Sequence, residues 1–364
     1  MARNRYRLTL MLAMALVVAA CGSGTEAETT TTEAAPSADP IKVAFVHVGP
    51  VADKGWSWAH DQGAQYLKAQ LGSGVEITTL ESIPEGSDSQ RVFEDLAAAG
   101  NKLIFGTSFG YMDPMLAAAA NYPDTVFMHA TGFKVADNMG NYFGAAEEGR
   151  YLSGMAAGAA SATGKIGYVA AFPIPEVLRG INAFTLGARE VNPDATVQVV
   201  WTSTWFDPPK ESTAAESLLD AGVDVIAMHQ DSAAPGQAAE ANGAKWVGYN
   251  TDMTEFAPNA WLTAAVWDWG PFYLATVQQV LDGTWAPEFH YGNMADGMVD
   301  IAPFGTSVDQ ATQDLILERK QQIIDGAFSV LPDPITKQDG TSQALGDIFG
   351  MDFFVEGVIG SPTG

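Results

Sequence analysis

The chain has 364 residues, enough for two domains of ordinary size, and 47% of them are hydrophobic, so a large buried core is expected. Its formal net charge of -25 argues against binding to nucleic acid and against a polybasic attachment to anionic lipid, whereas a small neutral or cationic ligand is compatible with it. The single cysteine, Cys21, excludes a disulfide framework and a thiolate metal cluster.

Residues 1–20 have the layout of a secretory signal peptide. A basic start is followed by an apolar stretch from Leu8 to Ala20, which is shorter than the roughly 20 residues of a membrane-spanning helix. The stretch runs into VAACG at residues 18–22, which resembles a bacterial lipobox. We therefore expect Cys21 to become the lipidated first residue of the mature protein. An ordinary signal peptide with an incidental cysteine is the alternative.

Residues 21–40 are predicted to form a disordered tether between this anchor and the folded body. They are dominated by Ser, Thr, Glu, Ala and Pro and show no apolar periodicity. Such a segment cannot bury enough surface to offset its chain entropy. No later stretch of the sequence has the length and apolar character of a transmembrane helix.

From Ile41 onward, short apolar strands alternate with amphipathic helices. The strands are rich in β-branched and aromatic residues and are bounded by Gly, Pro, Asp or Asn. The predicted strands of the first half are 41–48, 75–80, 102–107 and 125–129, with helices at 58–71 and 89–98 between them. Near-continuous apolar strands joined by helices predict a parallel sheet that is covered on both faces.

The same pattern restarts in the second half. Its predicted strands are 165–171, 196–201, 224–228 and 245–248. A Gly- and Ala-rich helix at 147–162 is expected at the crossing between the halves, and helix 271–281 and the segment after His290 are expected to cross back.

This repetition predicts two similar α/β lobes joined by hinge segments. Their predicted bounds are 41–146 with about 268–290, and 147–267 with about 291–364. Ligands of open α/β sheets bind beyond the carboxyl ends of the strands. In a two-lobed protein both sets of ends face one cleft, which closes by hinge motion.

Aromatic residues gather in the loops after the predicted strands. They are Trp56, Trp58, Phe109, Tyr111, Phe172, Trp205 and Trp267. Carboxylates and amides accompany them: Asp113, Asp231, Asn250 and Asp252. Core packing can explain any one of these aromatics, but it is a weaker explanation for the whole set in loops that converge on one cleft. Stacking faces, worth about 1–3 kcal/mol per base, together with a few polar groups suit a flat, neutral heterocycle.

Catalysis and metal binding are the alternatives. Residues 106–110 satisfy the G-x-S-x-G pattern, which would make Ser108 the nucleophile of an esterase, but no HGGG-like oxyanion segment precedes it. The five histidines lack the spacing of metal ligands, and the sequence has no phosphate-binding or dinucleotide-binding fingerprint. We therefore expect a binding protein with no catalytic residue, metal or cofactor.

Four stretches resemble the basic membrane protein (BMP) family, whose substrate-binding lipoproteins serve purine and nucleoside ABC importers. They are DKGWSWAHDQG at 53–63, TSFGYMD at 107–113, FPIPE at 172–176 and VWDWG at 266–270. The resemblance runs from Ile41 to about Asp352. It implies a type I periplasmic-binding-protein fold, an extracytoplasmic location, and permease and ATPase subunits as partners.

The resemblance also implies roles for individual residues. Family members sandwich the purine between two aromatic residues, which match Trp56 and Trp205 here. Asp252 matches an acidic residue of the family's G-x-D-x-D-like segment, and Asn250 stands at its first acidic position. Nucleoside binders carry a ribose-gripping lysine where this chain has Trp267, and a glycine-rich run where it has residues 229–232. Both departures imply a free purine base instead of a nucleoside.

The expected function is therefore capture of a purine, such as adenine or hypoxanthine, by a monomeric lipoprotein that delivers it to an ABC permease. A nucleoside-binding or sugar-binding protein of the same architecture is an alternative, and so is a receptor that signals its liganded state to a membrane partner. An esterase that uses Ser108 is the alternative of another class.

The lipobox predicts the effect of one substitution. Cys21→Ser should leave the protein exported but without lipid, so that it is released from membranes, because the acyl chains on that cysteine form the anchor. Fatty-acid labelling and membrane fractionation would measure this. A variant that still carries label and sediments with membranes would contradict the lipobox interpretation.

Overall fold

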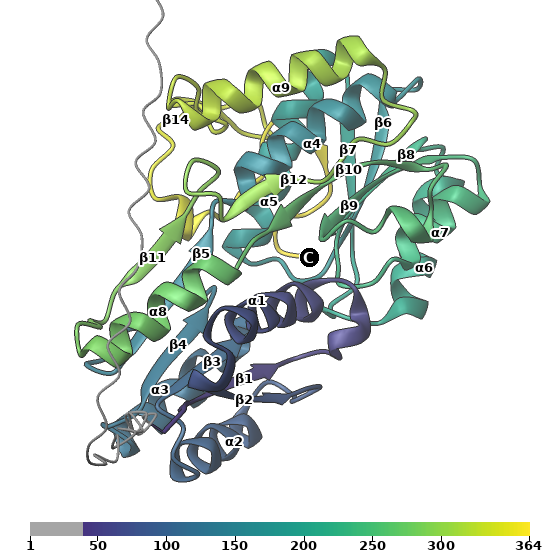
Figure 1. Ribbon diagram of the computed structural model, residues 1–364. Helices are drawn as coiled ribbons and strands as arrows, with labels where there is room; N and C mark the ends of the chain where they lie inside the picture. Colours follow the sequence, from purple (N-terminus) through teal and green to yellow (C-terminus); the bar gives the residue numbers. More distant parts are fainter. Residues whose placement is uncertain (1–38) are drawn as a thin grey trace, which may run out of the picture. The chain divides into compact units, whose positions relative to one another are not determined.

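The computed structural model describes residues 39–364, so the predicted signal peptide, Cys21 and all but the end of the predicted tether lie outside the described residues. Two sheets, each flanked by helices, organise the described part of the chain (Figure 1). The first has the strand order β11-β5-β4-β3-β1-β2 and is wholly parallel. The second has the order β12-β10-β9-β8-β6-β7-β15, and only β12 pairs in an antiparallel manner.

The strands of the first sheet are β1 (Ile41–His47), β2 (Val75–Leu80), β3 (Leu103–Thr107), β4 (Val126–Ala130), β5 (Met139–Gly144) and β11 (Phe289–Gly292). Those of the second are β6 (Lys165–Ala170), β7 (Thr196–Trp201), β8 (Val225–His229), β9 (Lys245–Asn250), β10 (Trp261–Trp267), β12 (Val299–Ile301) and β15 (Val358–Ile359). A separate pair is formed by β13 (Ile335–Thr336) and β14 (Ser342–Gln343).

The α-helices are α1 (Trp56–Leu71), α2 (Ser87–Ala98), α3 (Met112–Asn121), α4 (Ala146–Ala160), α5 (Pro175–Val191), α6 (Pro208–Asp220), α7 (Ala234–Ala241), α8 (Gly270–Asp282) and α9 (Gln310–Ile324). Short 3-10 turns lie at η1 (Val51–Asp53), η2 (Gly72–Gly74), η3 (Phe109–Tyr111), η4 (Thr254–Phe256) and η5 (Ile348–Gly350).

Helices cover both faces of the first sheet. In β1, Val43 and Phe45 pack into a core with residues of α1 and α8, such as Leu67 and Tyr273. The alternate residues of the same strand point to the other face, where they pack with residues of α2 and α3. Because each face is buried, the strand has to be apolar at nearly every position.

The second sheet is built in the same way. Ile166 and Tyr168 of β6 pack with α4 and α5, whereas Val169 packs with α6 and α7 on the opposite face. The chain passes between the sheets after β5, after β10 and after β11. The predicted two-lobed α/β architecture with helices on both faces of parallel sheets is therefore confirmed.

Several elements have no counterpart in the sequence-based prediction. Strand β5 contains two glycines and an asparagine, and β11 and β12 have only four and three residues, so none shows a long apolar pattern. Helix α5 lies where a helix between two strands was expected, but its start was not predicted, because Pro173 and Pro175 make this segment resemble a loop. Pro175 is tolerated because it occupies the first turn of the helix, where its missing N–H would have no helical partner.

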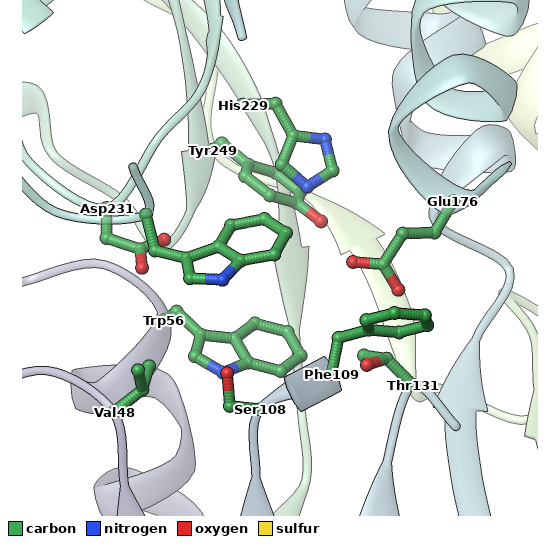
Figure 2. Close-up of a pocket in the computed structure, with 10 residues that line it drawn as sticks. Val48, Trp56, Ser108, Phe109, Thr131, Glu176, His229, Asp231 and Tyr249 are labelled. Atoms are coloured by element: carbon green, nitrogen blue, oxygen red, sulfur yellow. The ribbon is translucent and has the colours of Figure 1, made fainter. Parts of the chain in front are cut away.

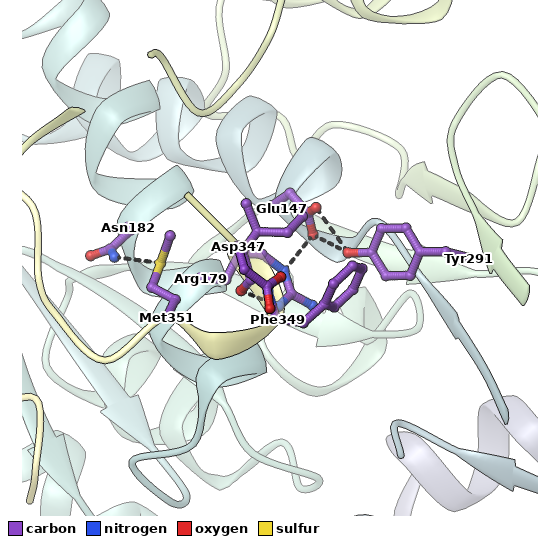
Figure 3. Close-up of polar contacts among 8 residues, drawn as sticks. Glu147, Arg179, Asn182, Tyr291, Asp347, Phe349 and Met351 are labelled. Atoms are coloured by element: carbon purple, nitrogen blue, oxygen red, sulfur yellow. Dashed lines mark hydrogen bonds and ion pairs between the residues drawn. The ribbon is translucent and has the colours of Figure 1, made fainter. Parts of the chain in front are cut away.

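A buried ion pair between α4 and α5 is hydrogen-bonded to β11 of the first sheet (Figure 3). Arg179 Nε of α5 donates to Glu147 Oε2 of α4 at 3.1 Å, and the two side chains are only 3% and 7% exposed. The hydroxyl of Tyr291, in β11, donates to the same carboxylate at 2.8 Å. Arg179 Nη1 also donates to the carbonyl of Ile348 at 3.1 Å, so the C-terminal segment is attached at this point.

This burial predicts a large effect for Arg179→Met. The variant leaves the Glu147 carboxylate buried without its cation, and we expect a loss of about 3–5 kcal/mol in the free energy of unfolding. Lys134→Met is the matched control, because it breaks the Lys134–Asp113 pair, whose side chains are 40% and 70% exposed, and should cost less than about 1 kcal/mol. Urea unfolding measures both. Equal losses in the two variants would contradict this account of the buried pair.

Candidate ligand-binding site

A narrow cavity of about 20 Å³ lies where the carboxyl ends of strands from both sheets meet (Figure 2). Its lining residues are Val48, Trp56, Ser108, Phe109, Thr131, Glu176, Trp205, His229, Asp231 and Tyr249. On the first-sheet side, the chain contributes residues just after β1, β3 and β4. On the second-sheet side, it contributes the ends of β8 and β9 and the loop after β7. This volume is far below the usual range for small-molecule sites, about 300–1,000 Å³, so the lining side chains nearly close the site in this structure.

Trp56 is positioned by the loop that precedes α1. The Asp53 carboxylate accepts hydrogen bonds from the backbone N–H groups of Gly55 at 2.7 Å and of Ser57 and Trp58 at 3.0 Å, which holds the first turn of the helix. Burial raises the pKa of Asp53 to about 6, although these N–H donors oppose the shift. The indole Nε1 of Trp56 donates to the carbonyl of Thr107 at 2.7 Å. Because its only donor is used, Trp56 offers a ligand its aromatic face and no hydrogen bond.

The same loop contacts the second lobe directly. A Cβ at Gly55 would lie 2.3 Å from the carbonyl oxygen of Asp231, so only glycine permits this approach. The hydroxyl of Thr251 donates to the carbonyl of Lys54 beside it. The loops after β1 and after β8 therefore meet at one side of the cavity.

Asp231 belongs to a chain of hydrogen bonds behind the cavity wall. Trp267 Nε1 donates to Asn250 Oδ1 at 2.9 Å, and Asn250 Nδ2 donates to Asp231 Oδ1 at 3.2 Å. Burial raises the pKa of Asp231 well above its ordinary value, and the nearby Asp53 carboxyl adds to the shift. Asn250 therefore orients both an aromatic and an acidic group of the site.

Glu176 lies at the opposite side of the cavity from Asp231, in the first turn of α5 (Figure 2). Burial raises its pKa to about 8, against the opposing charge of Arg179. Between the two acidic residues lie the rings of His229 and Tyr249, whose centroids are 4.4 Å apart. The cavity thus combines aromatic faces with one acidic group at each side.

A family comparison identifies this architecture. The profile of the Bmp family, described as ABC transporter substrate-binding protein PnrA-like, matches residues 41–330. This chain belongs to the Bmp family. The resemblance seen in the sequence is therefore confirmed.

Individual relatives agree with this assignment. A purine-binding protein of Brucella abortus is 45% identical over 89% of this chain and 95% of its own length. A putative ABC transporter glucose-binding protein of Haloferax volcanii is 42% identical over 88% of this chain and 81% of its own. A solute-binding protein of an ABC transporter system from Aeropyrum pernix has the same fold, with a TM-score of 0.70 and 19% identity, covering 80% of this chain and 93% of that one.

Bmp-family proteins are extracytoplasmic substrate-binding components of ABC transporters, so this chain is a binding protein and not an enzyme. The surroundings of Ser108 agree with this. Its hydroxyl donates to Glu85 Oε1 at 2.5 Å, whereas His129 Nε2 bonds the backbone carbonyl of Ser108 at 2.7 Å. His129 is therefore not placed to take a proton from the hydroxyl, and the esterase alternative is wrong. Residues 39–364 include no cluster of side chains suited to a metal ion and no helix that could span a membrane.

Four of the predicted site residues line the cavity of this family member: Trp56, Phe109, Trp205 and Asp231. Three more contact lining residues: Phe172, Asn250 and Trp267. Phe172 packs edge-on against Trp205 with centroids 4.9 Å apart. Trp267 lies edge-on to Trp56 at 6.0 Å and stacks on Trp269 at 4.7 Å. Their contact with a ligand stays a prediction.

The other four predicted residues lie away from the cavity lining. Trp58 packs under the Lys54 ammonium group at 3.7 Å, and Tyr111 is buried in the core of the first lobe. Asp113 forms an exposed ion pair with Lys134, and the exposed Asp252 accepts a hydrogen bond from the N–H of Thr254. Trp58 and Tyr111 each stand two residues beyond a lining aromatic at the start of a helix, so they point in another direction.

Besides Ser108, which was considered only as an esterase nucleophile, sequence reasoning missed five lining residues: Val48, Thr131, Glu176, His229 and Tyr249. Four of them lie at the carboxyl end of a strand, or next to one, which is the signal that could have found them. Glu176 follows a loop at the start of α5, within the family-like stretch FPIPE. Because no bounds were predicted for the helix between the strands at 165–171 and 196–201, this residue had no expected position.

The raised pKa of Glu176 predicts a pH effect on stability. Folded protein keeps this proton between the ordinary value of 4.5 and about 8, whereas unfolded protein loses it near 4.5. The stabilising contribution is therefore lost as the pH rises through this window. Burial lowers the pKa values of buried histidines such as His47 and His129 to about 4. Their effect on stability has the opposite sign, and it is confined to pH values below the ordinary histidine pKa of about 6.5.

We therefore expect the free energy of unfolding to fall between pH 6.5 and 8, and Glu176→Gln to reduce that slope because glutamine cannot ionise. Denaturant unfolding at several pH values measures it. Glu216→Gln, at an exposed position of α6, is the control and should keep the slope. An unchanged slope in Glu176→Gln would contradict the shift.

Proposed function

We propose that this protein captures a purine between Trp56 and Trp205 and delivers it to the permease and ATPase subunits of an ABC importer. The observation that carries the proposal is the pairing of large aromatic faces with an acidic group at each side of one narrow cavity between the strand ends of the two sheets. Stacking on an aromatic side chain is worth about 1–3 kcal/mol per base. The 45% identical relative named as a purine-binding protein supports this ligand class.

A free base fits the polar groups better than a nucleoside does. Purine bases carry N–H donors on both rings, and the carboxyl oxygens of Asp231 and Glu176 can accept from two sides. In a nucleoside the sugar replaces the hydrogen on N9, and each buried ribose hydroxyl without a partner costs about 1–3 kcal/mol. Trp267 stands at the position where the nucleoside-binding members that this chain resembles carry a lysine. Its indole offers one hydrogen-bond donor, and Asn250 already accepts from it.

Two observations favour other ligands. A second cavity of about 320 Å³ shares Phe109, Thr131 and Glu176 with the first, so a sugar attached to a purine has a neighbouring space to enter. The relative from Haloferax volcanii is named for glucose, which also suits aromatic faces and carboxylates. The nucleoside and the sugar are therefore included in the test.

We also propose that the lobes are divided as the sequence predicts, and that Cys21 carries the lipid anchor of a monomeric protein. Packing of α4 against α5 supports the assignment of α4 to the second lobe. Packing of α8 against α1 supports the assignment of α8 to the first lobe. A ligand held between the lobes stabilises their closed arrangement by its higher affinity for it.

Calorimetric titration with adenine, hypoxanthine, guanine, their nucleosides and glucose tests the ligand. We expect the bases to bind at least about tenfold more tightly than the nucleosides, because each unpaired hydroxyl has the cost given above, and glucose not to bind. Tighter binding of nucleosides would contradict the base preference. Binding of glucose in place of every purine would overturn the proposed function.

Trp56→Ala tests the stacking role. We expect it to weaken all purines together by about 5- to 150-fold, which corresponds to about 1–3 kcal/mol, because an aromatic face does not distinguish ring edges. Trp58→Ala is the matched control, since Trp58 lies two residues away on the same helix and outside the lining. It should leave every affinity unchanged. Equal losses in both variants would mean that the effect comes from a distorted helix.

A further inference from the structure

Arg150 is a fully buried cation beside the cavity-lining Tyr249, with no carboxylate partner among the residues that the structure describes. Its Nη1 donates to the carbonyl of Met228 at 2.7 Å, and its guanidinium lies 3.4 Å from the centroid of the Tyr249 ring. Its Nε and Nη2 have no hydrogen-bond partner within residues 39–364. Cation–π contact offsets part of the cost of burying a charge, but the remaining donors still require acceptors.

His229 has a ring nitrogen without a hydrogen-bond partner. Its Nδ1 is buried and has no partner within the described residues, while the ring itself lines the cavity. Figure 2 shows the other ring nitrogen directed toward the cavity. Burial, reinforced by the charges of Arg150 and Arg179, holds the pKa of His229 well below its ordinary value, so the ring is neutral. A neutral imidazole carries its proton on one nitrogen and accepts at the other.

Gly180 of α5 brings these two groups together. A Cβ built there would lie 3.8 Å from Arg150 Nε and 3.9 Å from His229 Nδ1, with no atom closer than 3.7 Å. Gly187 of the same helix differs, because a Cβ there would lie 2.0 Å from a carbonyl of α4. Helix packing therefore requires glycine at position 187 and does not require it at position 180, where glycine costs about 1 kcal/mol relative to alanine in a helix interior.

A water molecule in the space beside Gly180 would satisfy both groups. It would accept a hydrogen bond from Arg150 Nε and donate one to His229 Nδ1, and buried waters of this kind typically make about three hydrogen bonds to otherwise unsatisfied groups. Arginine can only donate, and its positive charge orients the hydrogens of the water away from Arg150 and toward Nδ1 of His229. Nδ1 of His229 is then the acceptor, and the proton must be on Nε2.

We propose that Arg150, through a water held beside Gly180, fixes His229 as the Nε2–H tautomer, so that His229 donates a hydrogen bond to the ligand. This inference rests on the proposed function and names a chemical group that the ligand must carry. That group is an unprotonated ring nitrogen or a carbonyl oxygen on the edge that faces His229. His229 is a specificity residue, and Arg150 and Gly180 are positioning residues.

Gly180→Ala tests the bridge without removing either polar side chain. The new methyl group meets its neighbours at ordinary van der Waals distances and occupies the space of the water. We expect a melting temperature equal to or higher than that of the wild type, because alanine favours the helix. Adenine affinity should fall about twofold, because about half of the molecules then carry the proton on Nδ1 and cannot donate to the ligand. A stabilised variant that binds less tightly cannot be explained by misfolding.

His229→Gln provides the matched second variant. Its side-chain amide presents an N–H donor near the position of Nε2 and has no tautomer to fix. We expect it to keep most of the affinity, and Gly180→Ala to have no further effect in the His229→Gln background. An equal loss from Gly180→Ala in both backgrounds would show that the methyl group acts in some other way and would overturn the proposal.

Nitrogen-15 chemical shifts of histidine in the ligand-free protein decide the tautomer independently of any ligand. We expect a protonated Nε2 and an unprotonated Nδ1 for His229 in the wild type, and loss of this preference in Gly180→Ala. Proton occupancy at Nδ1 in the wild type would overturn the inference, even if adenine binds. If adenine fails to bind the wild type while the tautomer is as expected, the proposed ligand is wrong and the positioning of His229 holds.

Discussion

The contact between Gly55 and the backbone of Asp231 sets the position of the two lobes at the cavity. Asp53 holds the turn that contains Gly55 and the start of α1, so the same carboxylate determines where Trp56 stands. Asp231, on the other side of the contact, is linked through Asn250 to Trp267. One close backbone approach therefore places an aromatic face from the first lobe and an acidic group from the second at the same cavity.

Burial governs the electrostatics of the site more than the net charge of -25 does. Asp231 and Glu176 lie where solvation of their charges is poor, so their pKa values rise. His229 loses basicity for the same reason and because Arg150 lies close to it. The cavity is therefore close to neutral, although the protein is strongly acidic. Such a site suits a neutral heterocycle whose edges carry hydrogen-bond donors and acceptors.

The Bmp fold by itself does not determine the ligand. Relatives of 45% and 42% identity are named for a purine and for glucose, two molecules with little chemistry in common. Both can be held by aromatic faces and carboxylates, so specificity depends on a few groups that read the edges of the ligand. In this chain those groups come from strand ends and from the first turn of α5, which can vary while the sheets stay the same.

The sequence by itself determined the fold class, because alternating apolar strands and amphipathic helices are physically incompatible with most other architectures. It also predicted that Trp56, Phe109, Trp205 and Asp231 meet, since all four follow strands whose carboxyl ends share one edge. The family resemblance came from the same loops.

Only the tertiary structure decided which neighbours of these residues face the cavity. A change of two positions at the start of a helix turns a side chain away, which is why Trp58 and Tyr111 lie elsewhere than predicted. Glu176, His229 and Arg150 come from α5, β8 and α4, and no local pattern relates residues so far apart in the chain. Their burial and their missing partners are properties of the packed protein, because desolvation depends on every element that surrounds a group and not on its sequence neighbours.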